Sequence, residues 1–132
     1  MMNQEPLFLT LAEITEIHGY QIEFFGGSDG LRSQDMLESA AGMPSSSFGG
    51  NFLHPTIPDM AAAYLFHLVE NHPFVDGNKR VGTMSALVFL ELNETDFNAT
   101  DDELTEVVLQ VAGGKMSKDA LSQFFRRHSL VL

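Results

Sequence analysis

The segment from His72 to Arg80 constrains the fold more than any other, because it separates two apolar segments of helical character. Pro73 cannot lie inside a helix, so the apolar run that precedes it must end at or before His72. Gly77 permits a tight backbone bend with positive φ. A second helix is therefore expected to begin near Asn78, with the unpaired N–H groups of its first turn facing the loop.

The same segment carries side chains suited to bind an anion and a metal ion. The amino end of a helix attracts anions, phosphate above all, and Lys79 and Arg80 add positive charge there. Asp76 offers an oxygen ligand suited to Mg²⁺, which accompanies phosphates in proteins. His72 is the side chain best suited to accept a proton near neutral pH. Together these parts indicate phosphoryl or nucleotidyl transfer, in which positioning and charge neutralisation do most of the work.

Each of these residues also has an ordinary structural interpretation. A single His before Pro is usually a turn or core residue, Asp before Gly usually belongs to a turn, and Lys-Arg is usually solvated surface. Their concentration within one short segment favours the functional interpretation over the structural one.

The length of the chain predicts one domain, residues 1–132, with a substantial hydrophobic core. The absence of cysteine excludes disulfides and zinc–cysteine sites. Residues 1–10 lack the features of a signal peptide, and the longest near-apolar stretch, Met84–Leu90, is far too short to cross a bilayer. We therefore expect a soluble cytoplasmic protein that makes no membrane contact.

The distribution of charge restricts the choice of ligand. A net charge of −11 argues against direct binding of nucleic acid, because phosphate backbones require a basic surface. Arg32 is the only Lys or Arg before Lys79, and none occurs between Val81 and Gly114. Lys79 and Arg80 are therefore an isolated positive pair that should draw anionic ligands to the loop. Arg32 is a candidate for a further anion contact, with a structural role preferred.

Helical periodicity and capping residues predict an all-α bundle of about six helices around a buried central helix. The charge-free run from Val81 to Leu90 indicates that the helix beginning near Asn78 is the central one. The predicted helices run from Thr10 to Phe25, from Ser33 or Asp35 to Ala41, from Pro58 to about His72, from Asn78 to Asn93, from Thr100 to Ala112 and from Ser117 to His128.

The irregular segment from Ser45 to Pro58 contains the only expected strands, a small flap or hairpin near residues 45–54. Phe48 and Phe52 either tuck into the core or belong to a flap that could receive a peptide edge to edge, and the sequence favours neither. Phe74, by contrast, is expected to point into the core and to anchor the loop that contains His72.

Residues 72–80 resemble the Fic motif, His-x-Phe-x-Asp/Glu-Gly-Asn-Gly-Lys/Arg-x-x-Arg. The matching positions are His72, Phe74, Asp76, Gly77, Asn78 and Arg80. Lys79 stands at the second Gly and Thr83 at the final Arg, and both departures are those of the death-on-curing (Doc) branch. Shorter matches, such as Phe25-Gly26-Gly27 and Gly30-Leu31-Arg32, extend the resemblance to the Fic/Doc family from Leu7 to about Phe125.

The resemblance implies an all-helical Fic/Doc fold and the use of ATP with Mg²⁺. Most Fic proteins transfer AMP to a protein hydroxyl, whereas Doc toxins transfer the γ-phosphate to translation elongation factor Tu and arrest protein synthesis. The partner of a Doc toxin is a prevents-host-death antitoxin. We therefore expect a Doc-type kinase toxin acting on a Ser/Thr hydroxyl; the alternatives are a Fic-type AMP transferase and a catalytically silent binding module.

Position by position, the resemblance implies that His72 is the general base and that Asp76 holds Mg²⁺. The phosphate-binding group would consist of Gly77, Asn78, Lys79 and Arg80. A bulky cation at residue 79 occupies space where phosphate would otherwise approach bare backbone, and Thr83 removes a bidentate phosphate clamp. Both departures are expected to change which phosphorus atom faces the acceptor hydroxyl.

Overall fold

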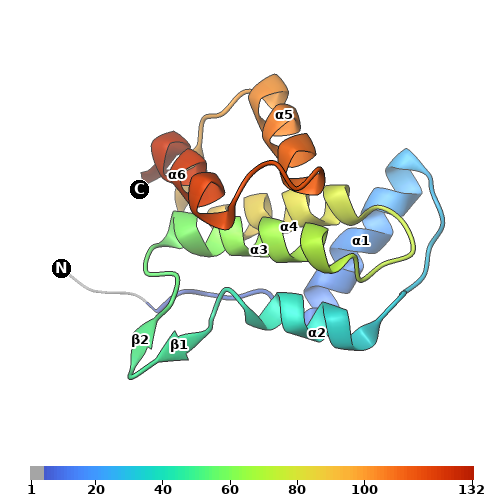
Figure 1. Cartoon of the computed structure of the whole chain (residues 1–132), viewed down its shortest axis with the longest axis horizontal. Coiled ribbons are helices and arrows are strands. Elements are labelled where there is room, and N and C mark those ends of the chain that lie inside the picture. Colours follow the sequence, from blue (N-terminus) through green and yellow to red (C-terminus); the bar gives the residue numbers. More distant parts are fainter. Residues whose placement is uncertain (1–4) are drawn as a thin grey trace.

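A computed structural model describes residues 5–132 of the chain. Its elements, in chain order, are α1 (Leu11–Phe25), α2 (Gln34–Gly42), β1 (Ser47–Phe48), β2 (Asn51–Phe52), α3 (Ile57–Asn71), α4 (Asn78–Leu92), β3 (Thr95–Phe97), α5 (Asp101–Ala112), α6 (Lys118–His128) and β4 (Ser129–Val131). Helices α3 and α4 lie side by side in the middle, with α1 and α2 on one side and α5 and α6 on the other (Figure 1). The predicted all-α class, with about six helices and a small hairpin, is confirmed.

Side-chain caps explain where most of the helices begin. Thr10 and Thr100 each form a capping box with the glutamate three residues later. Other N-cap side chains accept a hydrogen bond from a first-turn N–H group; these are Ser33, Thr56 and Ser117. No helix within residues 5–132 combines the length and apolar character that crossing a bilayer requires.

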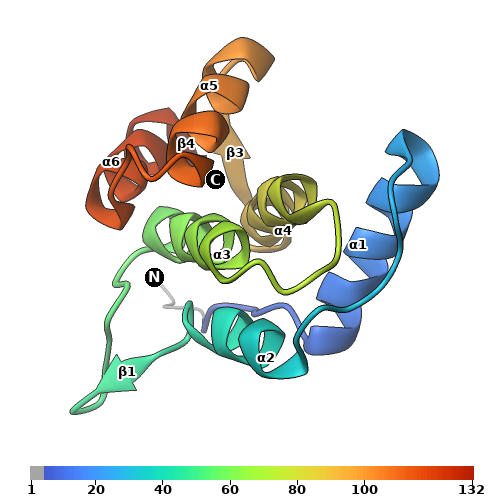
Figure 2. The same ribbon diagram turned by 45° about the vertical axis from the view of Figure 1, so that its right-hand side comes forward.

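Helix α3 is the most deeply buried element. Its residues 58–65 are all buried, as are Leu68 and Val69. Helix α4 keeps part of its surface open, with Thr83, Met84 and Leu87 only partly buried. The sequence predicted α4 as the central helix, but the structure gives that place to α3, which lies between the two outer layers (Figure 2). The charge-free run of α4 mixes apolar with small and polar residues, because one of its faces borders a groove.

Close packing of α3 and α4 fixes the two ends of the loop that joins them. A Cβ atom at Gly82 of α4 would lie 3.2 Å from the main-chain oxygen of Leu65 and 3.2 Å from a methyl group of Val69. Glycine thus allows the two helices to approach more closely than any other residue would. The loop therefore joins two helices whose separation is fixed by the core.

The predicted hairpin consists of β1 and β2, which pair antiparallel and project from the helical body (Figure 1). Gly49 and Gly50 at its tip have φ values of 60° and 84°, as a two-residue turn with left-handed residues requires. Phe48 is 82% exposed, whereas the Phe52 ring lies 5.9 Å from that of Phe8 and packs against the core. Phe52 therefore agrees with the interpretation as a core residue, and the exposed Phe48 with the interpretation as part of a flap.

A second antiparallel pair, β3 with β4, corrects the prediction that strands occur only within residues 45–54. Strand β3 lies between the predicted helix that ends at Asn93 and the one that begins at Thr100, where no strand was expected. It is paired so that Thr95 faces Val131 and Phe97 faces Ser129. Strands of three residues that pair across a long stretch of chain carry no alternating pattern, so the sequence offers no local signal for them.

Lys118 ties three segments of the chain together beside the core. Its ammonium group donates hydrogen bonds to Nε2 of His54, at 3.0 Å, and to Nε2 of His67, at 3.2 Å. Because an ammonium group has no acceptor, both imidazoles accept at Nε2 and are neutral. Burial, followed by the positive charge of Lys118, lowers the pKa of His67 to about 4 and lowers that of His54 as well. His67 therefore helps to hold these segments together.

This cluster predicts that acid destabilises the protein well above the pKa range of carboxylates. Between pH 6.5 and about 4, the imidazole of residue 67 binds a proton in the unfolded chain but not in the folded chain. The free energy of unfolding therefore decreases as the pH is lowered through this range. In urea denaturation at pH 7 and pH 5, His67→Gln should lose less stability between the two values than the wild type. His128→Gln is the control and should keep the full loss; an equal loss in all three proteins would contradict the assignment.

Candidate active site

The loop between α3 and α4 begins and ends with left-handed backbone. His72 caps α3 with φ 53° and ψ 52°, and Gly77 precedes α4 with φ 79° and ψ 18°. The predicted break before Pro73 and the predicted bend at Gly77 are both confirmed. A positive φ is uncommon for a residue other than glycine and costs free energy, so the conformation of His72 must be held by its surroundings.

Arg32 supplies much of that support from outside the loop. Its Nε and Nη2 atoms donate hydrogen bonds to the main-chain oxygens of His72, at 2.6 Å, and of Asn71, at 2.8 Å. The main-chain N–H groups of Arg32 and Ser33 both donate to the oxygen of Pro73, at 2.7 and 3.0 Å. A positive side chain that binds the last carbonyl groups of a helix also offsets the negative end of its dipole. The structural role preferred for Arg32 is confirmed.

Asn78 closes the loop from within. Its side chain is buried, with Oδ1 accepting a hydrogen bond from the N–H of Phe74 and Nδ2 donating to the oxygen of Phe74, both at 3.0 Å. Both polar atoms of the amide group therefore bind the main chain of Phe74. Any phosphate contact of residue 78, for which the sequence predicted a binding role, is left to its own N–H group at the start of α4.

His18 of α1 forms the floor beneath the loop. Its ring is 1% exposed and stacks on the buried ring of Phe74, with the centroids 3.8 Å apart and the planes at 7°. Its Nε2 lies 2.7 Å from the main-chain oxygen of Asp76. Phe74 thus anchors the loop as expected, but His18 was not singled out from the sequence. Its position four residues after Ile14, on the buried face of α1, was the available signal.

The carboxylate of Asp76 is held in place by main-chain donors. Oδ1 accepts a hydrogen bond from the N–H of Gly77 at 2.9 Å, and Oδ2 accepts one from the N–H of Ser28 at 3.2 Å. The Ser28 N–H and then the Gly77 N–H lower the pKa of Asp76, so its side chain is ionised at neutral pH. The N–H of Gly77, predicted to bind phosphate, is therefore engaged by the carboxylate. A Cβ atom at Gly27 would lie 2.6 Å from Oδ2, so this glycine leaves room for the carboxylate.

One cleft brings most of the predicted residues together. It has a volume of about 320 Å³ and is lined by Val69, His72, Val75, Asp76, Gly77, Asn78, Lys79 and Ala112. The first-turn N–H groups of α4 have no partner within the helix, and Gly77 provides no side-chain cap. A base, a carboxylate, a cation and the positive end of a helix dipole therefore adjoin the same space.

Arg80 lies in a neighbouring groove rather than in this cleft. The groove, with a volume of about 580 Å³, runs between α1, α4 and α5 and is lined by both Lys79 and Arg80. The guanidinium carbon of Arg80 lies 4.9 Å from the centre of the Phe25 ring, at a distance typical of a cation–π contact. Lys79 is thus common to the two spaces, and its charge acts on both.

The donors present around Asp76 fit Mg²⁺ only in company with phosphate. Within residues 5–132 there is no cluster of three or more His, Asp or Glu side chains that could hold a metal ion. Mg²⁺ in nucleotide sites is typically held by one or two carboxylates, substrate phosphates and water, so a single ionised and exposed carboxylate is sufficient. Asp76 is therefore the residue that would hold the ion.

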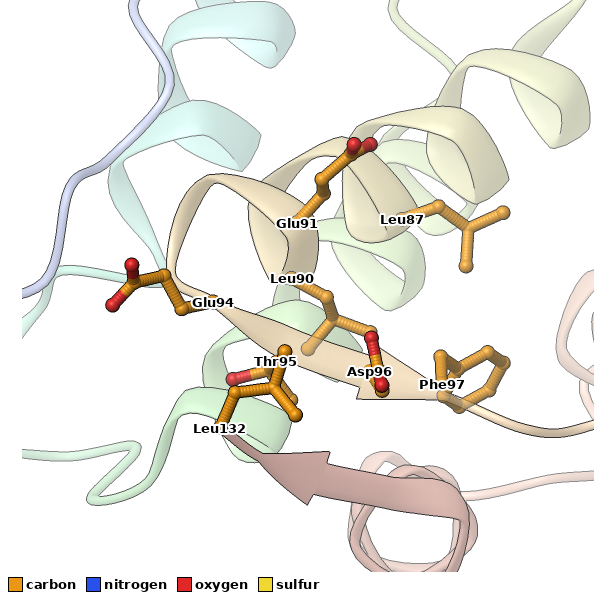
Figure 3. Close-up of a pocket in the computed structure, with 8 residues that line it drawn as sticks. All are labelled: Leu87, Leu90, Glu91, Glu94, Thr95, Asp96, Phe97 and Leu132. Atoms are coloured by element: carbon orange, nitrogen blue, oxygen red, sulfur yellow. The ribbon is translucent and has the colours of Figure 1, made fainter.

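A larger cleft of about 620 Å³ lies at the opposite end of α4. Its rim carries Glu91, Glu94 and Asp96, while Leu90 and Phe97 contribute apolar surface (Figure 3). Three carboxylates around one opening repel the phosphates of a nucleotide. This cleft is therefore excluded as the nucleotide site despite its size.

Comparison with known proteins agrees with the geometry. The sequence model of the Fic/DOC family matches residues 8–90. The chain is similar to Toxin Doc of Mycolicibacterium smegmatis (strain ATCC 700084 / mc(2)155), with 35% identity over 89 residues that cover 63% of this chain and 68% of the relative. It is also similar to Protein kinase doc of Escherichia phage P1, with 26% identity over 115 residues that cover 87% of this chain and 90% of the relative.

The buried bonds of Asn78 predict a strong effect on stability. Asn78→Ala would leave the N–H and C=O groups of Phe74 without their partners inside the protein, and should lower the free energy of unfolding by about 2 kcal/mol. Asn98→Ala, which removes one exposed bond to His128, is the matched control and should change it by less than about 0.5 kcal/mol. Urea denaturation measures both; equal effects would show that the Asn78 side chain does not hold the loop.

Proposed function

The chain belongs to the Fic/Doc family, and we propose that it is a Doc-type toxin that transfers the γ-phosphate of ATP to a Ser/Thr hydroxyl of a target protein. Translation elongation factor Tu is the target we propose, and its modification would block protein synthesis. The observation that carries the proposal is that His72, Asp76 and the open amino end of α4 adjoin one cleft. The names of the two relatives, a toxin and a protein kinase, support the toxic and phosphotransfer parts.

His72 is the general base of the proposed reaction. It is exposed on the cleft, where an acceptor hydroxyl of a protein substrate can reach its ring. As the new P–O bond forms, the imidazole takes the proton of that hydroxyl, and the bond between the γ-phosphorus and the bridging oxygen of ADP breaks. The backbone contacts of Arg32 keep the imidazole at the mouth of the cleft throughout.

The remaining residues bind and orient the triphosphate. Lys79 and the N–H groups at the start of α4 offer positive potential to its oxygens. Asp76, ionised and fixed by Ser28 and Gly77, would hold Mg²⁺. When bound, that ion neutralises phosphate charge as it develops in the transition state.

Two positions support transfer of the γ-phosphate rather than of AMP. Thr83 stands where Fic motifs carry a phosphate-clamping Arg, and its hydroxyl donates a hydrogen bond to the main-chain oxygen of Lys79 at 2.8 Å. That hydroxyl is therefore engaged within α4. Lys79 adds a side chain at the mouth of the cleft, where the motif otherwise has glycine. Both features favour a triphosphate orientation different from that of AMP-transferring Fic enzymes.

We further propose that a prevents-host-death type antitoxin silences the enzyme from the groove between α1, α4 and α5. Exposed apolar side chains border this groove, among them Phe25 and Leu109. Among the described residues that line it, the cations are Lys79 and Arg80, which lie at the end nearest the catalytic cleft. An amphipathic antitoxin segment bearing a carboxylate would therefore fit the groove and pair with the charges that attract the nucleotide.

The proposal predicts which phosphorus atom reaches the target. With Mg²⁺, purified elongation factor Tu and ATP labelled at either the γ or the α phosphorus, only the γ label should become covalently bound to the factor. His72→Ala should slow this labelling by at least about 100-fold, as expected for loss of a general base, with an unchanged circular dichroism spectrum. His128→Ala is the control and should keep full activity. Transfer of the α label would instead identify an AMP transferase.

The close approach of Gly27 to Asp76 predicts a metal-dependent effect. Gly26→Ala and Gly27→Ala both place a side chain on backbone with positive φ, 84° and 113°, and each should lower stability by about 1 kcal/mol. Only a Cβ at residue 27 meets the Asp76 carboxylate, whereas at residue 26 it meets nothing within 4 Å. Gly27→Ala alone should therefore require more Mg²⁺ for half-maximal activity. An identical Mg²⁺ dependence of the two variants would remove Asp76 from the proposed metal site.

A further inference from the structure

We propose that His18 is a positioning residue of the same site, which orients the Asp76 carboxylate through the peptide group that follows it. The inference rests on the proposed function, because it concerns the side chain that would hold Mg²⁺. It assigns to a buried residue of α1 a part in metal binding although its ring is 1% exposed and lies beneath the loop.

The peptide group between Asp76 and Gly77 connects the imidazole with the carboxylate. Its oxygen lies 2.7 Å from Nε2 of His18, and its N–H group donates to Oδ1 of Asp76 at 2.9 Å. Because a peptide group is planar, a partner that fixes its C=O also fixes the direction of its N–H. The His18 ring therefore determines where the donor to Oδ1 points, and so how the carboxylate faces the cleft.

The ring of His18 is itself restrained in its orientation. It lies parallel to the ring of Phe74, at 3.8 Å and 7°, and both rings are buried. Phe74 is in turn held at its N–H and C=O by Asn78. A ring that is stacked and hydrogen-bonded in a buried site cannot turn freely, so it is a rigid support for an exposed loop residue.

The bond requires the proton of the imidazole to be on Nε2, because the peptide oxygen is an acceptor. The other ring nitrogen, Nδ1, is 3.8 Å from Oδ1 of Asp29, beyond hydrogen-bond distance. At Gly77 a Cβ atom would lie 3.3 Å from Cδ1 of Ile22 and 3.5 Å from Nε2 of His18, so this peptide packs against both side chains of α1. His18 is thus the side chain that donates to the oxygen of this peptide, while Ile22 packs against the same peptide without a hydrogen bond.

The test compares two substitutions that separate stacking from hydrogen bonding. His18→Phe keeps an aromatic ring against Phe74 but loses the donor, whereas His18→Gln keeps a donor near the position of Nε2. Ile14→Val, on the same buried face of α1, is the control for loss of stability without a change at the loop. Binding of Mn²⁺ in the presence of a non-hydrolysable ATP analogue is measured by electron paramagnetic resonance, so no transfer activity is needed.

The expected result is a Mn²⁺ affinity at least about 10-fold lower in His18→Phe, as is common when a group that orients a metal ligand is lost. His18→Gln and Ile14→Val should stay close to the wild type. A folded His18→Phe protein with the wild-type affinity for Mn²⁺ would overturn this inference but not the proposed function. Wild-type protein that binds neither Mn²⁺ nor the analogue would overturn the proposed function, and the inference with it.

A measurement on the wild-type protein decides the matter if His18→Phe does not fold. Nitrogen-15 NMR of the imidazole groups reports which ring nitrogen of His18 carries the proton. The structure requires a protonated Nε2 whose signal is broadened in the Mn²⁺ nucleotide complex and sharp in the Mg²⁺ complex, since a paramagnetic ion held by Asp76 would lie close to it. An Nε2 without a proton would overturn the inference.

Discussion

Two buried hydrogen bonds between the Asn78 side chain and the main chain of Phe74 hold the functional part of this molecule together. They close the chain into a turn at the point where α3 has ended and α4 begins. Closure of this turn allows the Phe74 ring to enter the core and to stack on His18. It also leaves His72, Val75 and Asp76 at the surface. The chemistry assigned to the loop therefore depends on an asparagine whose side chain is itself buried.

The side chains that support the loop are buried, and those with reactive or charged groups are exposed. Its supporting side chains, Phe74 and Asn78, are buried, while His72, Asp76 and Lys79 are exposed on the cleft. The cost of left-handed backbone at His72 is offset by contacts that come from outside the loop, chiefly from Arg32. Reactive side chains can thus remain accessible to a large protein substrate while their positions are fixed from below.

The sequence predicted most of what is local. Capping boxes at Thr10 and Thr100, the end of a helix before Pro73 and the turn at Gly77 depend on a few adjacent residues, and all are present. The pairing of β3 with β4 and the central place of α3 depend on distant parts of the chain, which no short pattern records.

The difference between features set by adjacent residues and features set by distant residues also applies to the site. The residues with reactive groups could be found because His, Asp, Lys and Arg cluster in one segment. Two of their supports could not, because a buried His18 and a Gly27 that leaves room for a carboxylate have no distinctive sequence pattern. Only the structure shows that the Asn78 side chain and the Gly77 N–H group bind other atoms of the loop, namely the Phe74 main chain and the Asp76 carboxylate.

Lys79 makes the cleft beside His72 and the neighbouring groove electrostatically dependent on each other. It lines both, and the chain carries no Lys or Arg between residues 81 and 114 that could supply positive potential in its place. With a net charge of −11, the protein as a whole repels a triphosphate, and Lys79 and Arg80 offset that repulsion at this end of α4. A partner that places a carboxylate in the groove beside Lys79 and Arg80 would cancel that local attraction without covering His72. Inhibition of this kind requires no change in the catalytic loop, only occupation of the adjacent groove.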